Sequence, residues 1–258
     1  MYQQDCKIVE KEQIKSDVFV LTLESKEIAS KADPGQFVEI SCGQNTDFIL
    51  RRPFSIHHVK DSTIKILFRT IGRATMSLSS YSKGDILNII GPLGQGFEIS
   101  KEAIIIAGGM GIAPLYYLAE QMLAKGIKPR VLIGAKNKKE LLGQEAISEL
   151  GVEPKIATDD GSIGFKGLVT DLLKQEIYTQ IPNPSSLIPT LYACGPEPML
   201  YEVAKIANDN SLDNQLSFER FMACGLGACL SCVCETKKGL IRVCKEGPVI
   251  GGEELLEV

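Results

Sequence analysis

Short apolar runs separated by turn residues fill the chain up to about residue 99. Five runs of strand length are rich in β-branched and aromatic residues: 18–25, 36–41, 54–59, 63–70 and 85–90. Turn sequences such as Asp33-Pro34-Gly35 and Lys83-Gly84-Asp85 lie between them. Short strands at this spacing predict a small antiparallel barrel.

The period of the apolar positions changes after residue 100. Apolar runs of strand length now alternate with segments of helical period. The expected strands are 103–107, 130–135, 154–158 and 190–195, and the expected helices are 114–125, 139–150, 167–177 and 198–210. This alternation predicts a parallel sheet with helices on both faces.

The last segment is short, rich in Cys and Gly, and too poor in apolar residues to form its own core. Small modules of this kind usually need a metal to hold them together. The sequence therefore predicts a multidomain β and α/β protein. Its expected domains are a β-barrel over residues 1–99, an α/β domain over 100–215 and a small metal-binding domain over 216–258.

Composition and charge exclude several classes of protein. The 258 residues are 44% hydrophobic and 23% charged, which is ordinary for a globular protein. The net charge of -4 argues against nucleic acid as a main partner. Residues 1–15 are polar and unlike a secretory signal, and the uncharged run 103–119 is shorter than a membrane span. We expect a cytoplasmic protein that neither binds nucleic acid nor enters a membrane.

Five of the eight cysteines lie between residues 224 and 244. Without an export signal, such a cluster indicates metal binding rather than disulfides. The spacing Cys224-x4-Cys229-x2-Cys232, followed by Cys244, is typical of plant-type [2Fe–2S] centres. A structural zinc site and free thiols are the alternatives, but zinc ribbons normally carry two C-x2-C pairs. Cys234 is a competing ligand.

Two motifs in the barrel segment are suited to a flavin nucleotide. The run Arg52-Pro53-Phe54-Ser55 offers a cation for a pyrophosphate, an aromatic face for the ring and a hydroxyl for a ring nitrogen. Further along, Phe68-Arg69 precedes Gly72-Arg73-Ala74-Thr75, which opens a predicted helix whose N–H groups suit a phosphate. Each motif alone is equally compatible with an ordinary strand bearing a surface arginine. Their occurrence together, upstream of a nucleotide-type βαβ unit, is more specific.

Two glycine turns in the α/β segment are suited to a nicotinamide dinucleotide. Gly108, Gly109 and Gly111 follow a buried strand and open a helix, where glycine allows close approach of a pyrophosphate. Cys194 and Gly195 end a later strand, at the edge of a parallel sheet where ligands bind. Neither an acid nor an arginine that would decide between NAD and NADP follows the strand 130–135.

The order of these motifs resembles that of the ferredoxin-reductase superfamily. The motifs are Pro34-Gly35-Gln36-Phe37, Arg52-Pro53-Phe54-Ser55, Gly91-Pro92-Leu93-Gly94 and Cys194-Gly195-Pro196. The stretches 219–229 and 243–249 narrow the resemblance to the electron-transfer subunits of type B dihydroorotate dehydrogenases. The resemblance covers essentially the whole chain.

The resemblance implies cofactors, a partner and roles for residues. Members of that family bind FAD and one [2Fe–2S] cluster, use NAD, and pair with an FMN-containing catalytic subunit in a heterotetramer, two of each chain, for pyrimidine synthesis. The residues implied to contact FAD are Arg52, Pro53, Phe54, Ser55, Phe68, Arg69, Thr70, Ala74 and Thr75. The residues implied to hold the cluster are Cys224, Cys229, Cys232 and Cys244.

The three predicted sites indicate a mechanism. The flavin would exchange a hydride with the nicotinamide and single electrons with the cluster, so this chain needs no general acid or base of its own. One alternative is the reductase subunit of a related NAD(P)H–ferredoxin, sulfide or sulfite oxidoreductase complex. The alternative of another class is a zinc-stabilised binding module without enzymatic activity.

Overall fold

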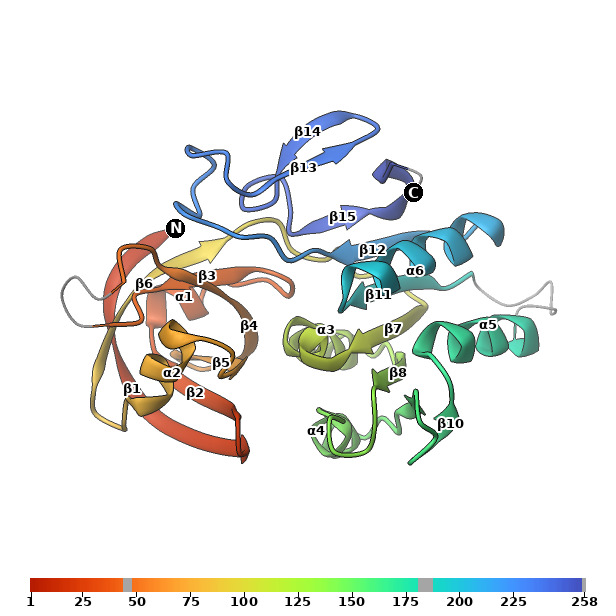
Figure 1. Cartoon of the computed structure of the whole chain (residues 1–258), viewed down its shortest axis with the longest axis horizontal. Helices are drawn as coiled ribbons and strands as arrows, with labels where there is room; N and C mark the ends of the chain where they lie inside the picture. The colour runs from red at the N-terminus through yellow and green to blue at the C-terminus, as the bar shows by residue number, and fades with distance from the viewer. Residues whose placement is uncertain (44–47, 181–187, 257–258) are drawn as a thin grey trace. The chain divides into compact units, whose positions relative to one another are not determined.

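The computed structural model describes residues 1–43, 48–180 and 188–256, and these form two compact units (Figure 1). The barrel unit comprises residues 1–96, 219–234 and 240–248. The sheet unit comprises residues 97–218, 235–239 and the chain from 249 onward. The predicted third segment, 216–258, contributes to both units, and its last two residues lie outside the described part. Its separation as an independent domain stays a prediction.

Among the described residues, six strands close the predicted barrel, and every pair of neighbours is antiparallel. In barrel order they are β1 (Tyr2–Lys15), β2 (Val18–Glu24), β5 (Thr63–Arg69), β4 (Arg52–Lys60), β3 (Phe37–Ile40) and β6 (Ile86–Leu93). Two helices accompany them, α1 (Lys26–Ala29) and α2 (Arg73–Ser80). The predicted antiparallel barrel is confirmed.

The longest strand of the barrel, β1, is missing from the sequence prediction. Only Cys6 and Ile8 of its residues are buried, so its sequence lacks the apolar alternation typical of a strand. β1 is stabilised by pairing with β2 on one side and with β6 on the other. This pairing closes the barrel, so β2 and β6 have no free edge.

The sheet unit holds a sheet of seven strands within the described ranges, in the order β10-β9-β8-β7-β11-β12-β15. All its pairs are parallel except that of β15. The strands are β7 (Ala103–Gly108), β8 (Arg130–Ala135), β9 (Lys155–Thr158), β10 (Phe165–Lys166), β11 (Thr190–Cys194), β12 (Asn214–Ser217) and β15 (Val249–Gly251). The central strands are fully buried, as expected for a sheet covered on both faces.

Helices cover both faces of this sheet, as predicted. α3 (Ile112–Ala124) contacts α4 (Gln144–Glu149), and α5 (Val169–Gln180) contacts α6 (Glu197–Asp209); Figure 1 shows the two pairs on opposite sides of the sheet. A short 3-10 turn, η1 (Gly109–Gly111), precedes α3, and a second, η2 (Gly252–Glu254), follows β15. None of the described helices is long and apolar enough to cross a membrane.

The helix predicted over 139–150 is shorter than expected. The side chain of Asn137 accepts hydrogen bonds from the backbone N–H groups of Lys139 and Glu140, at 2.9 and 3.1 Å. Such local bonds give the backbone an alternative to a helix. Gly143 then takes a left-handed conformation, with φ of 80°, and α4 begins only at Gln144.

The Cys-rich segment contains a hairpin of β13 (Val233–Thr236) and β14 (Gly239–Arg242). As its composition predicts, its few apolar side chains do not form a core alone. A single buried cluster combines side chains of this segment with two from the barrel: Cys232, Cys234, Val243 and Cys244 with Phe37 of β3 and Leu93 of β6. The barrel therefore supplies the apolar surface that the segment lacks.

Candidate functional site

The four predicted cluster cysteines lie in the barrel unit as two pairs. Cys224 and Cys229 lie on one loop, and the Cys224 thiol is close enough to Cys229 to lower its pKa. Cys232 and Cys244 are in contact, because the backbone N–H of Cys244 donates to Sγ of Cys232 at 3.4 Å. In a [2Fe–2S] centre four thiolates serve two irons, two on each. The observed pairing fits that arrangement.

The two pairs differ in their electrostatic surroundings. The pKa of Cys229, which is exposed, is lowered to about 6, first by hydrogen bonds from Ser231 and then by those with Cys224. The pKa of the buried Cys244 is raised to about 12, first by burial and then by Cys232. Because a cluster takes thiolates, Cys229 is already close to its ligand state, whereas Cys244 releases its proton when it binds iron.

Glycines give the loop between Cys224 and Cys229 its curvature. Gly225 and Gly227 have φ of 64° and 81°, which L side chains rarely adopt. This conformation lets the N–H of Leu226 donate to Sγ of Cys224 at 3.3 Å. Hydrogen bonds to the sulfurs are among the features that set the potential of an iron–sulfur cluster. The loop therefore fits a sulfur-ligated cluster in its backbone as well as in its side chains.

Across the described ranges, no three His, Cys, Asp or Glu side chains converge closely enough to hold a single metal ion. Cys234, the competing ligand, lies in the buried cluster with Phe37 and Leu93. Its Sγ accepts a hydrogen bond from Nη2 of Arg220 at 3.6 Å. The ligand set with Cys232 rather than Cys234 stays a prediction, and the contact between Cys232 and Cys244 supports it.

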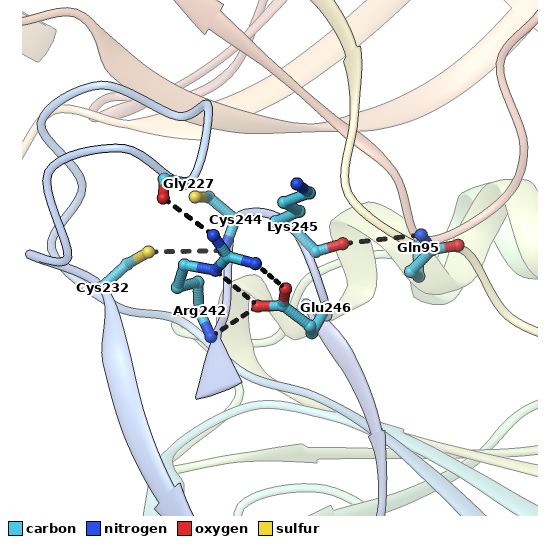
Figure 2. A network of polar contacts seen from close by, with 7 residues as sticks. All are labelled: Gln95, Gly227, Cys232, Arg242, Cys244, Lys245 and Glu246. Atoms are coloured by element: carbon cyan, nitrogen blue, oxygen red, sulfur yellow. Dashed lines mark hydrogen bonds and ion pairs between the residues drawn. The ribbon is translucent and has the colours of Figure 1, made fainter. Parts of the chain in front are cut away.

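Arg242, which the sequence prediction missed, joins the cluster loop to the chain around Cys244 (Figure 2). Its Nη1 donates to the carbonyl of Gly227 at 3.1 Å, and its Nε donates to Glu246 at 3.0 Å. Nη2 forms an ion pair with the second oxygen of the same carboxylate. The opposite charges four residues apart on either side of Cys244 were the available signal in the sequence.

Gln95 fixes the chain after Cys244 to the end of the barrel. Its backbone N–H donates to the carbonyl of Gly247 at 2.5 Å. Its side-chain Nε2 donates to the carbonyl of Lys245 at 3.5 Å, as Figure 2 shows. The fourth cysteine is thereby held by residues distant in sequence, which is why spacing alone identifies it less directly than the other three.

Replacing Arg242 by Gln is expected to weaken retention of the cluster about tenfold, because loss of residues that support metal ligands typically costs roughly 10- to 100-fold in affinity. The measurement is the rate at which a chelator removes iron from the holoprotein. Lys238→Gln is the matched control, because Lys238 pairs with Glu254 at 2.7 Å, outside the loop network. Equal rates for both variants would show that the Arg242 network does not support the cluster.

The predicted flavin residues of β4 divide between the core and the surface. Phe54 is buried and packs edge-to-face on Phe68 of β5, with ring centroids 5.8 Å apart. Arg52 and Ser55 are half-buried. Nη1 of Arg52 donates to the carbonyl of Leu50 at 2.9 Å, so its guanidinium is held close to the strand. The solvent-facing groups available to a flavin nucleotide here are therefore a cation and a hydroxyl.

The second flavin motif runs from the end of β5 into the first turn of α2. Arg69 forms an ion pair with Asp17 at 3.3 Å, and the N–H of Thr70 donates to the carbonyl of Asp17 at 2.8 Å. Oγ1 of Thr75 accepts hydrogen bonds from the N–H groups of Ile71 and Gly72 at 3.0 and 3.1 Å, so it caps the helix from within. Ala74 is buried beside it in the helix. The structure brings these residues together at one end of β5, and their contacts with FAD stay a prediction.

The two predicted nicotinamide turns meet in the sheet unit, at the carboxyl ends of β7 and β11. A Cβ added to Gly111 would overlap the carbonyl of Cys194 and lie 2.7 Å from the nitrogen of Gly195. A Cβ added to Gly195 would lie 3.0 Å from Cα of Gly108. Parallel sheets bind ligands at this edge, and the glycines leave backbone there for a pyrophosphate to approach. The structure thus places both turns together, and their contacts with a dinucleotide stay a prediction.

Comparisons with known proteins identify two domains and whole-length relatives of this chain. Residues 219–256 match the iron–sulfur cluster binding domain of dihydroorotate dehydrogenase B, and residues 105–205 match the oxidoreductase NAD-binding domain. The chain is 36% identical over 255 residues to the dihydroorotate dehydrogenase B (NAD(+)), electron transfer subunit, of Fusobacterium nucleatum, with 95% of each chain covered. It is 38% identical over 261 residues to the protein of the same name from Caldanaerobacter subterraneus, with 99% of each covered.

A solved structure is similar over nearly the whole chain. The NADH-dependent reduced ferredoxin–NADP oxidoreductase, studied for flavin-based electron bifurcation, has a TM-score of 0.85 and 28% identity. The match covers 98% of this chain and 90% of that one. The barrel, the parallel sheet and the iron–sulfur segment define an oxidoreductase subunit of the ferredoxin-reductase fold. The chain belongs to the family of electron transfer subunits of dihydroorotate dehydrogenase B (NAD(+)). The predicted fold class and resemblance are confirmed.

Proposed function

We propose that this chain carries electrons between NAD and the FMN-containing catalytic subunit of a dihydroorotate dehydrogenase, through FAD and a [2Fe–2S] cluster, in pyrimidine synthesis. The observation that carries the proposal is the contact of Cys244 with Cys232, beside the glycine-curved loop that carries Cys224 and Cys229. The names and whole-length similarity of the relatives support the identity of the catalytic partner.

Each unit of the chain contributes its own residues. The four cysteines would hold the cluster, and Arg52 and Ser55 would orient FAD on β4. In the sheet unit the turns at Gly108, Gly111 and Gly195 would receive the dinucleotide. When bound, the flavin supplies the conversion between two-electron exchange with a nicotinamide and one-electron exchange with a cluster. The protein's task is to bind and orient these groups.

The assembly and its location are part of the same proposal. We expect a heterotetramer with two electron-transfer and two catalytic chains, located in the cytoplasm. Co-purification with the catalytic chain, followed by mass determination of the complex, tests the stoichiometry.

A visible spectrum of anaerobically purified protein, recorded before and after NADH, tests the electron-transfer proposal. We expect flavin bands over broad iron–sulfur absorption, with both bleached by NADH, because the flavin accepts the hydride and passes electrons to the cluster. A colourless protein containing zinc would support the non-enzymatic binding module instead. Flavin without iron in protein never exposed to air would contradict the assignment of the four cysteines.

A second candidate function is favoured by the solved structure with the TM-score of 0.85. In this alternative the chain serves as the reductase subunit of an NAD(P)H–ferredoxin oxidoreductase complex. The chain that co-purifies discriminates the two functions. An FMN-containing subunit that oxidises dihydroorotate supports the first, and a larger flavoprotein that reduces ferredoxin supports the second.

A further inference from the structure

Glu39 is a buried carboxylic acid in the barrel unit that the functions described above leave unexplained. It lies on β3, opposite Pro53 of β4 and Ile90 of β6, and its exposed fraction is 0%. Neither carboxyl oxygen has a hydrogen-bond partner among the described residues. A buried polar group without a partner costs roughly 1–3 kcal/mol, and more when charged. Such a residue, buried between a barrel strand and the cluster loop, calls for a functional explanation.

The carboxyl group lies directly against the cluster loop. A Cβ added to Gly225 would lie 2.7 Å from Cγ and 2.9 Å from Oε1 of Glu39. Gly225 follows Cys224, and the loop continues to Cys229. The space beside Gly225 is therefore filled by the Glu39 side chain, and any larger residue at 225 would displace it.

The charged and titratable groups around Glu39 come from three segments. Burial is the first cause that raises its pKa to about 7; Arg51 and Arg52 oppose the rise, and Cys229 adds to it. Cys42, further along the chain from β3, also interacts electrostatically with it.

Neither arginine neutralises this carboxyl group through a hydrogen bond. Nη1 of Arg51 donates to the carbonyl of Asn88 at 2.8 Å, and Nη2 donates to the Asn88 side chain. Nη1 of Arg52 donates to the carbonyls of Leu50 and Arg51. The two guanidinium groups are thus engaged elsewhere, and the negative charge of an ionised Glu39 acts on the cluster loop without direct pairing.

We propose that Glu39 is a positioning residue that supports the cluster loop at Gly225 and lowers the reduction potential of the cluster held by Cys224, Cys229, Cys232 and Cys244. The inference rests on the proposed function, because it requires the cluster. A carboxylate in a poorly solvated site opposes the arrival of an electron nearby, since like charges repel more strongly at low dielectric. Net charge is one of the features that set iron–sulfur potentials.

The test is the midpoint potential of the cluster in the holoprotein and in Glu39→Gln, measured by EPR-monitored redox titration between about pH 6 and about pH 10. Gln keeps the size of the side chain and removes its charge. We expect a more positive potential in Glu39→Gln at the alkaline end, by about tenfold in the equilibrium constant of reduction, or about 59 mV for one electron. The difference should shrink toward the acidic end, where the carboxyl group of Glu39 is protonated and neutral like Gln. Equal potentials at every pH, or a more negative potential in the variant, would overturn the proposal.

Glu24→Gln is the matched control, because Glu24 is an exposed carboxylate of the same unit and its loss makes the same change in net charge. We expect no change in potential for this variant, and a shift as large as that of Glu39→Gln would overturn the proposal. If Glu39→Gln does not fold, Glu39→Asp withdraws the charge from Gly225 and should shift the potential in the same direction by less; no shift would contradict the proposal. A wild-type protein without the EPR signal of a reduced cluster contradicts the proposed function itself.

Discussion

Replacing Cys232 by Ala is expected to abolish iron binding, with the affinity for iron falling by at least about 100-fold. Loss of a residue that only supports a metal ligand costs roughly 10- to 100-fold, and loss of a ligand itself costs more. Cys232 is the residue through which the cysteine loop meets Cys244. Its Sγ accepts the N–H of Cys244 at 3.4 Å, and its carbonyl accepts the N–H of Val243 at 3.1 Å. Removing the thiol leaves one iron with a single protein ligand. Iron content and visible absorption of anaerobically purified protein measure the effect, while the flavin bands should remain.

Cys234→Ala is the matched control for this experiment. Both cysteines are buried and belong to the same apolar cluster, so the two substitutions remove the same atoms from similar surroundings. The two cysteines differ in their contacts: Cys234 accepts a hydrogen bond from Arg220, whereas Cys232 contacts a second cysteine, Cys244. We expect Cys234→Ala to retain iron. Loss of iron in Cys234→Ala together with retention of iron in Cys232→Ala would show that Cys234, and not Cys232, is the ligand.

The contrast between these cysteines shows what spacing predicts and what it leaves open. The C-x4-C-x2-C pattern predicts a cluster loop because three thiolates must converge from one tight turn. It does not decide between Cys232 and Cys234, which lie two residues apart. That choice depends on which side chain meets Cys244, a contact between segments 12 residues apart in the chain. The residues that hold Cys244 in place, Gln95 and Arg242, are of ordinary type and only the fold brings them to the site.

The fold shows the same contrast between what local sequence predicts and what contacts between distant segments decide. Buried strands such as β7 and β11 were predicted because strands covered on both faces are apolar throughout. β1 was missed because its place depends on closing the barrel and not on its own pattern. Glu39 is the extreme case, since acidic residues are almost never fully buried without a partner, whereas the structure buries Glu39 against Gly225. Local patterns predict elements, and contacts between distant segments determine the polar residues of a site.

Replacing Gly111 by Ala is expected to destabilise the sheet unit by about 3 kcal/mol and to weaken NADH binding, because overfilling a packed site costs about 1–3 kcal/mol and here the neighbour is backbone. Gly111 has φ of -60°, so its conformation suits any residue and only space is lacking. The added Cβ would overlap the carbonyl of Cys194 and lie 2.7 Å from the nitrogen of Gly195. The two nicotinamide turns would have to separate. The thermal unfolding midpoint and the Kd for NADH measure the two effects.

Gly109→Ala tests whether space, and not the loss of a glycine as such, causes the effect. Gly109 lies in the same turn, but a Cβ there has no heavy atom within 4 Å and the strain comes from its φ of 55°. A left-handed conformation costs an L residue about 1–2 kcal/mol. We therefore expect Gly109→Ala to lower the unfolding midpoint by less than Gly111→Ala does. Equal unfolding midpoints and equal Kd values for NADH in the two variants would contradict a role of the close approach between Gly111 and Cys194 in shaping the dinucleotide site. If only Gly111→Ala lost NADH binding, the contact between those turns would be established as its framework.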